Sequence, residues 1–228
     1  MGAADMSALF PHLQEIALFG GDRLDEVGDA PRWVYFPSNS AISVVSTMRD
    51  GRDVETASIG YEGVAGLLPA LTETGATSRM CVQIGGGAIT LPAAKLRERF
   101  EQSPALMSLV LGSVMALSVQ AERSAACHAL HPLNARLARM LLVCENRVNR
   151  SQMELTQDHL GAMTGALRSS ISLIASEFKE LGLIHYSRGH IEILDHEGLE
   201  SRACECYGHD QARRDTMSAA VSGLEAAA

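Results

Sequence analysis

Residues 155–195 read LTQDHLGAMTGALRSSISLIASEFKELGLIHYSRGHIEILD. Thr156 is of a type that caps a helix N-terminus, and Asp158 suits the first turn that follows. Gly165 is placed to turn the chain, and a second helix is predicted over residues 168–181. Two short helices joined by a glycine turn have the spacing of a helix-turn-helix.

The second of these helices has a buried stripe at helical spacing, which consists of Ile171, Ile174, Ala175 and Phe178. Two strands are predicted next, over residues 183–186 and 190–194, around Ser187-Arg188-Gly189. This hairpin would form a wing. Asp195 is placed to cap a last helix, predicted to end near residue 207, in which Cys204 and Cys206 would point in different directions.

The second helix of such a motif enters the major groove of DNA, and its first turn meets base edges. Arg168 stands at that turn, where its guanidinium could pair with O6 and N7 of guanine. Ser169 and Ser172 share its exposed face and are candidates for further base contacts. The candidate phosphate contacts are Thr156, Gln157 and, in the wing, Arg188.

Upstream, apolar and polar residues alternate in short runs that glycines separate. This pattern favours an antiparallel sandwich or roll. The Asp50-Gly51 pair predicts a hairpin turn. Strands are predicted over residues 33–36, 41–48, 53–59, 80–84 and 88–91. A short helix over residues 93–100 follows them.

A long helix is predicted over residues 104–131, and a further helix over residues 133–148. Apolar positions in the long helix alternate in steps of three and four, as in a coiled-coil seam. We expect this helix to pair with a second copy of itself, although a core helix of a monomer would show a similar pattern. The candidate dimer contacts are Val110, Val114, Leu117 and Ala121.

The composition is that of a globular protein, with 228 residues, 46% of them hydrophobic and 20% charged. The formal net charge is −8, of which −6 falls on residues 151–228, so no broad basic surface for nucleic acid is indicated. Five scattered cysteines favour reduced thiols in a cytoplasmic protein. No uninterrupted apolar run suggests a membrane span, and no signal peptide is evident.

Two groups of residues could ligate a metal. Cys127 and His131 share a helix face beside His128, and Cys204 and Cys206 lie two apart. Packing is the favoured interpretation of both groups, so no metal or other cofactor is expected. The sequence contains no nucleophile elbow, phosphate-binding loop or zinc-protease motif, so we do not expect an enzyme.

Taken with segments 125–131, 135–142 and 199–207, residues 155–195 resemble the winged helix-turn-helix of the Crp/Fnr transcription regulators of bacteria. The segments VYFP at 34–37, DG at 50–51 and IGYEG at 59–63 resemble the cyclic-nucleotide-binding-type β-roll of the same family. The resemblance implies a cytoplasmic homodimer that places two recognition helices in successive major grooves of a near-palindromic DNA site. RNA polymerase is a further candidate partner, and no membrane contact is implied.

The chain departs from the family's cyclic-AMP-binding members at the candidate effector pocket, which comprises Gly63, Gly66, Ser78 and Arg79. Those members carry a Gly-Glu pair and a later Arg-Ser or Arg-Thr pair. Here no carboxylate follows Gly63 or Gly66, and Arg79 is displaced by one residue, which in a strand reverses its face. We therefore expect no cyclic AMP binding, and the effector, if one exists, is not identified.

Two further departures concern the recognition helix and the cysteines. Ser169 and Leu173 stand where cyclic-AMP-type members carry Glu and Arg, so base preference should differ. Iron–sulfur members have clustered N-terminal cysteines, whereas the first cysteine here is Cys81, which argues against an oxygen-sensing cluster.

The predicted fold class is therefore α+β. The expected domains are an N-terminal antiparallel β-roll of double-stranded jelly-roll type over residues 1–102, a dimerisation helix over 103–131, a winged helix-turn-helix over 132–208 and a disordered tail over 209–228. The expected function is sequence-specific transcription regulation. The alternative is a small-molecule-binding or scaffold protein whose helix-turn-helix no longer binds DNA, an interpretation that the acidic C-terminal half supports.

Overall fold

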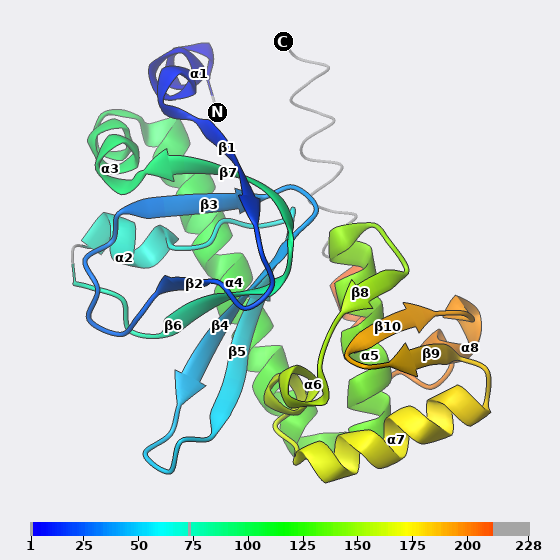
Figure 1. The fold of residues 1–228 in the computed structure, drawn as a ribbon. Helices are drawn as coiled ribbons and strands as arrows, with labels where there is room; N and C mark the ends of the chain where they lie inside the picture. The colour runs from blue at the N-terminus through cyan, green and yellow to red at the C-terminus, as the bar shows by residue number, and fades with distance from the viewer. Residues whose placement is uncertain (1, 73, 212–228) are drawn as a thin grey trace. The chain divides into compact units, whose positions relative to one another are not determined.

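A computed structural model of the chain describes residues 2–72 and 74–211. They form two compact units that meet between Ala125 and Ala126, inside the long helix α4 (Pro104–Leu130). The predicted tail falls partly outside this range, since residues 212–228 are not described, while residues 206–211 are helical. Figure 1 shows the elements of each unit.

The first unit carries two antiparallel sheets, neither of them closed, with strand orders β1-β7-β3 and β2-β6-β4-β5. Together with the helices this confirms the predicted α+β class. In chain order the elements are α1 (Ala3–Leu9), a 3-10 turn (Phe10–His12), β1 (Gln14–Leu18), β2 (Arg23–Asp25), β3 (Trp33–Pro37), β4 (Ala41–Thr47), β5 (Asp53–Ile59), α2 (Leu67–Thr72), β6 (Arg79–Ile84), β7 (Gly86–Pro92), α3 (Ala93–Gln102) and the first part of α4.

The predicted hairpin turn at Asp50-Gly51 joins β4 to β5, and Thr47 pairs with Asp53 across it. Gly51 adopts φ +82°, a left-handed conformation that favours glycine. The five predicted strands are present with small differences at their ends. The sequence analysis did not find α1, α2, β1 or β2.

Two apolar clusters hold this unit together. One surrounds Val34 and Leu91 and includes Leu106 and Val110 of α4. The other surrounds Ile42 of β4 and Val82 of β6, and Leu117 of α4 packs against it. One face of α4 is therefore part of the core of the β-roll.

The second unit begins with the last turn of α4 and carries a three-stranded antiparallel sheet of order β8-β10-β9. Its elements are α5 (Leu133–Val148), β8 (Gln152–Glu154), α6 (Gln157–Thr164), α7 (Arg168–Glu180), β9 (Ile184–Ser187), β10 (His190–Ile193) and α8 (His196–Glu200). Two expectations are wrong here. No strand was expected between the helix over 133–148 and Thr156, where β8 forms. The last predicted helix ends at Glu200, and turns separate it from the helical residues that begin at Cys206.

Among the described residues α4 alone has the length and apolar composition that a membrane-spanning helix requires. The sequence analysis expected no such segment because it required an unbroken apolar run. Isolated polar residues in α4 break the run, so the helix did not meet that requirement. Core helices of globular proteins also meet the criterion of length and composition. In this unit Leu106 and Val110 of α4 pack against buried residues of the β-roll, while 17% of the most apolar stretch of α4 is buried.

Asp25, at the end of β2, is a buried carboxylate whose Oδ2 atom has no hydrogen-bond partner. Burial, with repulsion from Asp29, raises the pKa of Asp25 from 3.8 to about 6. The folded state therefore disfavours the charged form, so this group's contribution to stability is full below about pH 4 and is lost as the pH rises through 6.

We expect Asp25→Asn to raise the free energy of unfolding at pH 7 by about 1 to 3 kcal/mol and to remove part of the decline between pH 4 and pH 7. Urea unfolding of both proteins across that pH range measures the difference. Parallel pH profiles for wild type and variant would contradict the assignment.

Candidate nucleic-acid interface

The turn between α6 and α7 is built by three local features of the sequence. Thr156 caps α6 as predicted, since its hydroxyl oxygen accepts a hydrogen bond from the backbone of His159 at 3.2 Å. Gly165 ends α6 in a left-handed conformation, φ +64°. A Cβ on Gly161 would lie 2.8 Å from the carbonyl oxygen of Ala166, so only glycine allows the turn to close over α6.

Helix α7 buries Ile171, Ala175 and Phe178, while Ile174 is half-buried. This is the stripe that the sequence predicted, and it orients the rest of the helix. Arg168 and Ser169 are exposed, and Ser172 is half-buried. The three residues predicted to contact bases therefore lie on one accessible face.

The Arg168 side chain is 68% exposed at the first turn of α7. Its Nη1 atom lies 3.5 Å from Oδ2 of Asp158, and its Nε atom donates to Oε1 of Gln157 at 3.4 Å. Exposed ion pairs of this kind contribute about 0 to 1 kcal/mol to stability. They orient the guanidinium, and a ligand can displace them at little cost. The N-cap residue Leu167 makes no side-chain cap, which suits the first turn to an anion.

The predicted phosphate contacts lie in two places. Thr156 is exposed and Gln157 half-exposed at the start of α6, and the Thr156 hydroxyl can still donate while its oxygen caps the helix. Arg188 is exposed in the hairpin between β9 and β10, where it adopts φ +51° before Gly189 at φ +82°. The wing thus presents the Arg188 side chain to solvent at its tip.

Leu173, at which the sequence departs from the cyclic-AMP-type members, is an exposed apolar side chain on α7. Leu173 is 75% exposed and lies one helical turn after Ser169. An apolar side chain on a recognition face can contact the methyl group of thymine. The signal was present in the helical spacing, because position 173 falls opposite the buried stripe.

The candidate dimer contacts of α4 differ in their exposure within the first unit. Val110 is buried in the core of its own β-roll, and Val114 and Leu117 pack against the same unit. Of the predicted contacts only Ala121 is exposed. Substituting Leu117 would therefore disturb the β-roll as well as any interface.

A different stripe of α4 is exposed and apolar. Leu111 is 59% and Met115 66% exposed, on the side opposite Val110 and Leu117. Gly112 lies between them, and a Cβ at this position would meet no atom within 4 Å. We call Leu111, Gly112, Met115 and Val119 the exposed seam of α4. These residues form one face of the helix at spacings of three and four.

The candidate effector residues lie on β6 and in the two loops that flank α2. Arg79 of β6 pairs with Asp53 of β5, across the intervening strand β4, while Met80, the next residue, is buried in the core. Gly66 has φ +78°, and a Cβ there would lie 2.9 Å from the carbonyl oxygen of Trp33. Gly63 and Ser78 are half-buried in the loops that flank α2.

A buried polar network also lies within the first unit. Glu55 accepts hydrogen bonds from Ser43 and, at 2.7 Å, from Nε2 of Gln83. Ser58 donates to Oε1 of Gln83 at 3.1 Å, and its backbone carbonyl accepts from Gln120 of α4 at 2.9 Å. These buried polar groups are hydrogen-bonded to one another. The space between the sheet and α4 therefore contains polar side chains of the chain itself.

The cysteines are arranged differently from the prediction. Cys204 lies in the turn after α8 and Cys206 begins the next helical segment, so the two side chains converge instead of diverging. Both lie beside Cys127 and His131, and Cys127 and Cys204 are 3.6 Å apart between sulfur atoms. Hydrogen bonding between these two lowers the pKa of Cys127 and raises that of Cys204. His128, next in the chain, is outside this group.

Two comparisons with known proteins match about a third of the chain each. Residues 135–202 match the model of the Crp-like helix-turn-helix domain. The HTH-type transcriptional regulator Cmr of Mycobacterium tuberculosis (strain CDC 1551 / Oshkosh) is 42% identical over 72 residues. That match covers 32% of this chain and 28% of Cmr.

Two solved structures share the fold over most of the chain. FixK2 from Bradyrhizobium japonicum superposes with a TM-score of 0.70 at 15% identity, covering 84% of this chain and 98% of that one. A CRP-family transcriptional regulator from Thermus thermophilus superposes with a TM-score of 0.69 at 17% identity, covering 83% and 96%. At sequence identities this low, the similarity to these two structures shows a shared fold and nothing further.

Proposed function

We propose that this chain, a Crp/Fnr-type transcription regulator with a helix-turn-helix DNA-binding domain, binds a near-palindromic site on double-stranded DNA as a cytoplasmic homodimer. The observation that carries the proposal is the exposed guanidinium of Arg168 at the first turn of α7. In this position of a helix-turn-helix a side chain reaches base edges. Ser169, Ser172 and Leu173 would complete the reading face, and Thr156, Gln157 and Arg188 would hold phosphates.

The exposed seam of α4 supports dimerisation. Leu111 and Met115 are apolar, exposed and adjacent on one face of a helix whose other face belongs to the β-roll. A second copy of α4 would remove these side chains from water by the same pattern. We therefore still infer that two copies of α4 pair with each other. We assign the contact to the exposed seam instead of Val110, Val114 and Leu117.

The acidic net charge argues that affinity depends on a few local contacts and not on a broad basic surface. Selection from a random duplex pool at fixed salt tests the function directly, because affinity for DNA depends steeply on salt. We expect enrichment of one motif with two-fold symmetry. Uniform, weak retention of all duplexes would instead support the scaffold interpretation.

The β-roll is proposed not to respond to cyclic AMP. A bound cyclic phosphate needs an opposing guanidinium, and Arg79 is engaged by Asp53 on the side of β6 away from Met80. No carboxylate follows Gly63 or Gly66 to hold a ribose hydroxyl.

Calorimetry with cyclic AMP and cyclic GMP at up to millimolar ligand should therefore detect no binding, and neither nucleotide should change DNA affinity. Arg79→Ala is the matched variant. A micromolar dissociation constant that Arg79→Ala abolishes would return the protein to the ligand-gated class.

A further inference from the structure

Four residues with metal-ligating side chains meet in the second unit, although they come from two distant parts of the chain. Cys127 and His131 occupy the end of α4, one helical turn apart, and Cys204 and Cys206 follow α8. The one ligand atom that each offers lies within 4.8 Å of the other three. Three thiols and an imidazole form a Cys₃His set, which is a common zinc ligand set.

Two of the six separations between these ligand atoms are close to those of tetrahedral zinc, and all six are at most 4.8 Å. With Zn–S near 2.3 Å and Zn–N near 2.0 to 2.1 Å, two sulfurs should lie about 3.8 Å apart, and a sulfur and a nitrogen about 3.6 Å apart. The sulfurs of Cys127 and Cys204 are 3.6 Å apart, and Sγ of Cys206 lies 3.7 Å from Nδ1 of His131. A disulfide would need about 2.0 Å between sulfurs, and the three cysteines of the set are free thiols.

The imidazole of His131 is oriented from outside the cluster. Its Nε2 atom lies 3.1 Å from Oε1 of Glu205, while its Nδ1 atom faces the sulfurs. A carboxylate on the far nitrogen fixes the tautomer and leaves the near nitrogen as a ligand, as in carboxylate–histidine–zinc arrangements. Glu205 lies between the two cysteines in the chain, so one short segment supplies two ligands and this orienting group.

Burial and charge also fit a closed site. Cys127, Cys204 and Cys206 are all buried, with at most 8% exposure. Three thiolates and one zinc ion leave a net charge of −1. The buried guanidinium of Arg139, which also pairs with Asp210 at 2.8 Å, interacts electrostatically with Cys127 and Cys206.

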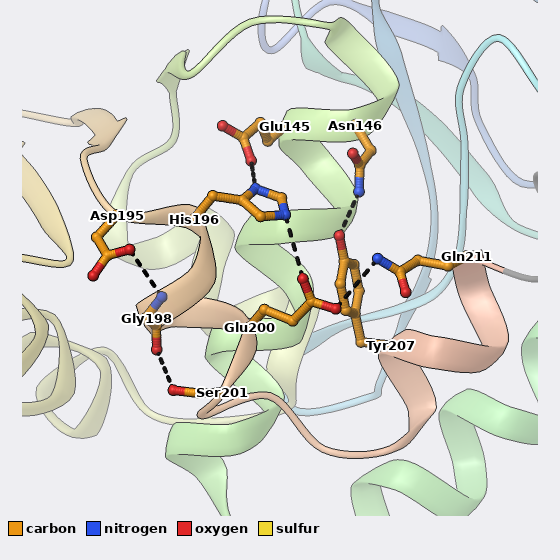
Figure 2. A network of polar contacts seen from close by, with 9 residues as sticks. All are labelled: Glu145, Asn146, Asp195, His196, Gly198, Glu200, Ser201, Tyr207 and Gln211. Atoms are coloured by element: carbon orange, nitrogen blue, oxygen red, sulfur yellow. Dashed lines mark hydrogen bonds and ion pairs between the residues drawn. The ribbon is translucent and has the colours of Figure 1, made fainter.

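The segment that carries Cys204 and Cys206 is held in place by contacts that do not involve the cluster. Nδ1 of His196 lies 2.7 Å from Oε2 of Glu145, and Asn146 donates to the hydroxyl of Tyr207 at 2.9 Å. Figure 2 shows these contacts. Gln211 donates to Glu200 at 3.4 Å in the same network. Residues 196–211 are thereby anchored on α5, so the ligands are preorganised beside α4.

We propose that Cys127, His131, Cys204 and Cys206 bind one zinc ion as a structural site. Four protein ligands leave no open coordination position, so the site is structural and not catalytic. The ion would join the end of α4 to the C-terminal segment of the second unit, immediately before Pro132 and α5. Zinc would thus stabilise the unit that carries α6, α7 and the wing.

The test is the metal content of the full chain, produced with zinc and purified under reducing conditions without chelators. We expect one zinc per chain by elemental analysis. Replacement by Co²⁺ should give thiolate charge-transfer bands and the intense visible bands of tetrahedral cobalt. Cys204→Ser and His131→Ala should lose most of the bound metal, whereas Cys81→Ser and His128→Gln should retain it.

Chelation of the wild-type protein provides a measurement that does not depend on a variant folding. A strong zinc chelator should lower the melting temperature of the wild type, and added zinc should restore it. Less than about 0.2 zinc per chain in reduced wild type, or equal zinc in wild type and Cys204→Ser, would overturn the proposal. So would a Cys127–Cys204 disulfide in the protein as purified with zinc, which would identify the group as a redox pair.

Discussion

Met115→Glu, in the exposed seam of α4, should convert the protein to a monomer and lower its affinity for a full DNA site by about 100-fold or more. Met115 is 66% exposed, so a glutamate is tolerated in the isolated chain. Pairing two copies of α4 through the seam would bring two carboxylates together in an apolar interface, and removing each from water is severely unfavourable. A monomer reads one half-site and loses the gain in affinity that comes from linking two.

Leu109→Glu is the matched control. Leu109 is 43% exposed on the same helix, but it lies outside the exposed seam. Sedimentation at micromolar concentration should show a dimer for Leu109→Glu and a monomer for Met115→Glu. A dimer that survives Met115→Glu unchanged, or one that only Leu109→Glu dissociates, would place the interface elsewhere.

Arg168→Ala should weaken binding by about 1 to 3 kcal/mol per half-site, because a bidentate contact to guanine contributes that much discrimination. A near-palindromic site contains two such contacts, so the full effect is about 2 to 6 kcal/mol, or about 30-fold to 20,000-fold. The loss should fall mainly on one base position in each half-site. Arg168 pairs only weakly with Asp158 and Gln157, so its removal leaves the fold of α7 intact.

Two variants separate base reading from general charge. Arg168→Lys keeps the charge and loses the planar fork, so it should behave more like alanine than like wild type. Lys179→Ala removes a charge from the other end of α7 and should leave base preference unchanged. Affinity measured across single-base variants of the selected site decides the matter, since equal weakening at every base would mean that Arg168 contacts phosphate.

The local sequence was sufficient for much of the second unit. Thr156 and Gly165 fix the two ends of α6 through a cap and a left-handed turn, and both are recognisable residue by residue. The predicted bounds of α5 and β5 agree with the structure. By contrast β2 and β8 have three residues each and depend on pairing with distant strands, which no local pattern records.

The site was harder to predict where a side chain's role depends on what covers it. Helix α4 is apolar on two faces, so its seam spacing could not say which face meets its own β-roll and which is exposed. Cys204 and Cys206 lie close to Cys127 because the helix ends at Glu200. The helical pattern of the sequence continues past this residue and did not predict the end. Arg168, by contrast, was found because its position relative to Gly165 follows from local turn chemistry.

Methylation interference on a duplex selected by the protein tests most directly whether two recognition helices read one site. Methylation of guanine N7 should block binding at two symmetric positions, which lie about one helical turn, or about 10 base pairs, apart. Arg168→Ala should abolish the interference at both positions together. A single position of interference, or none on any duplex, would contradict a dimer that reads bases through Arg168.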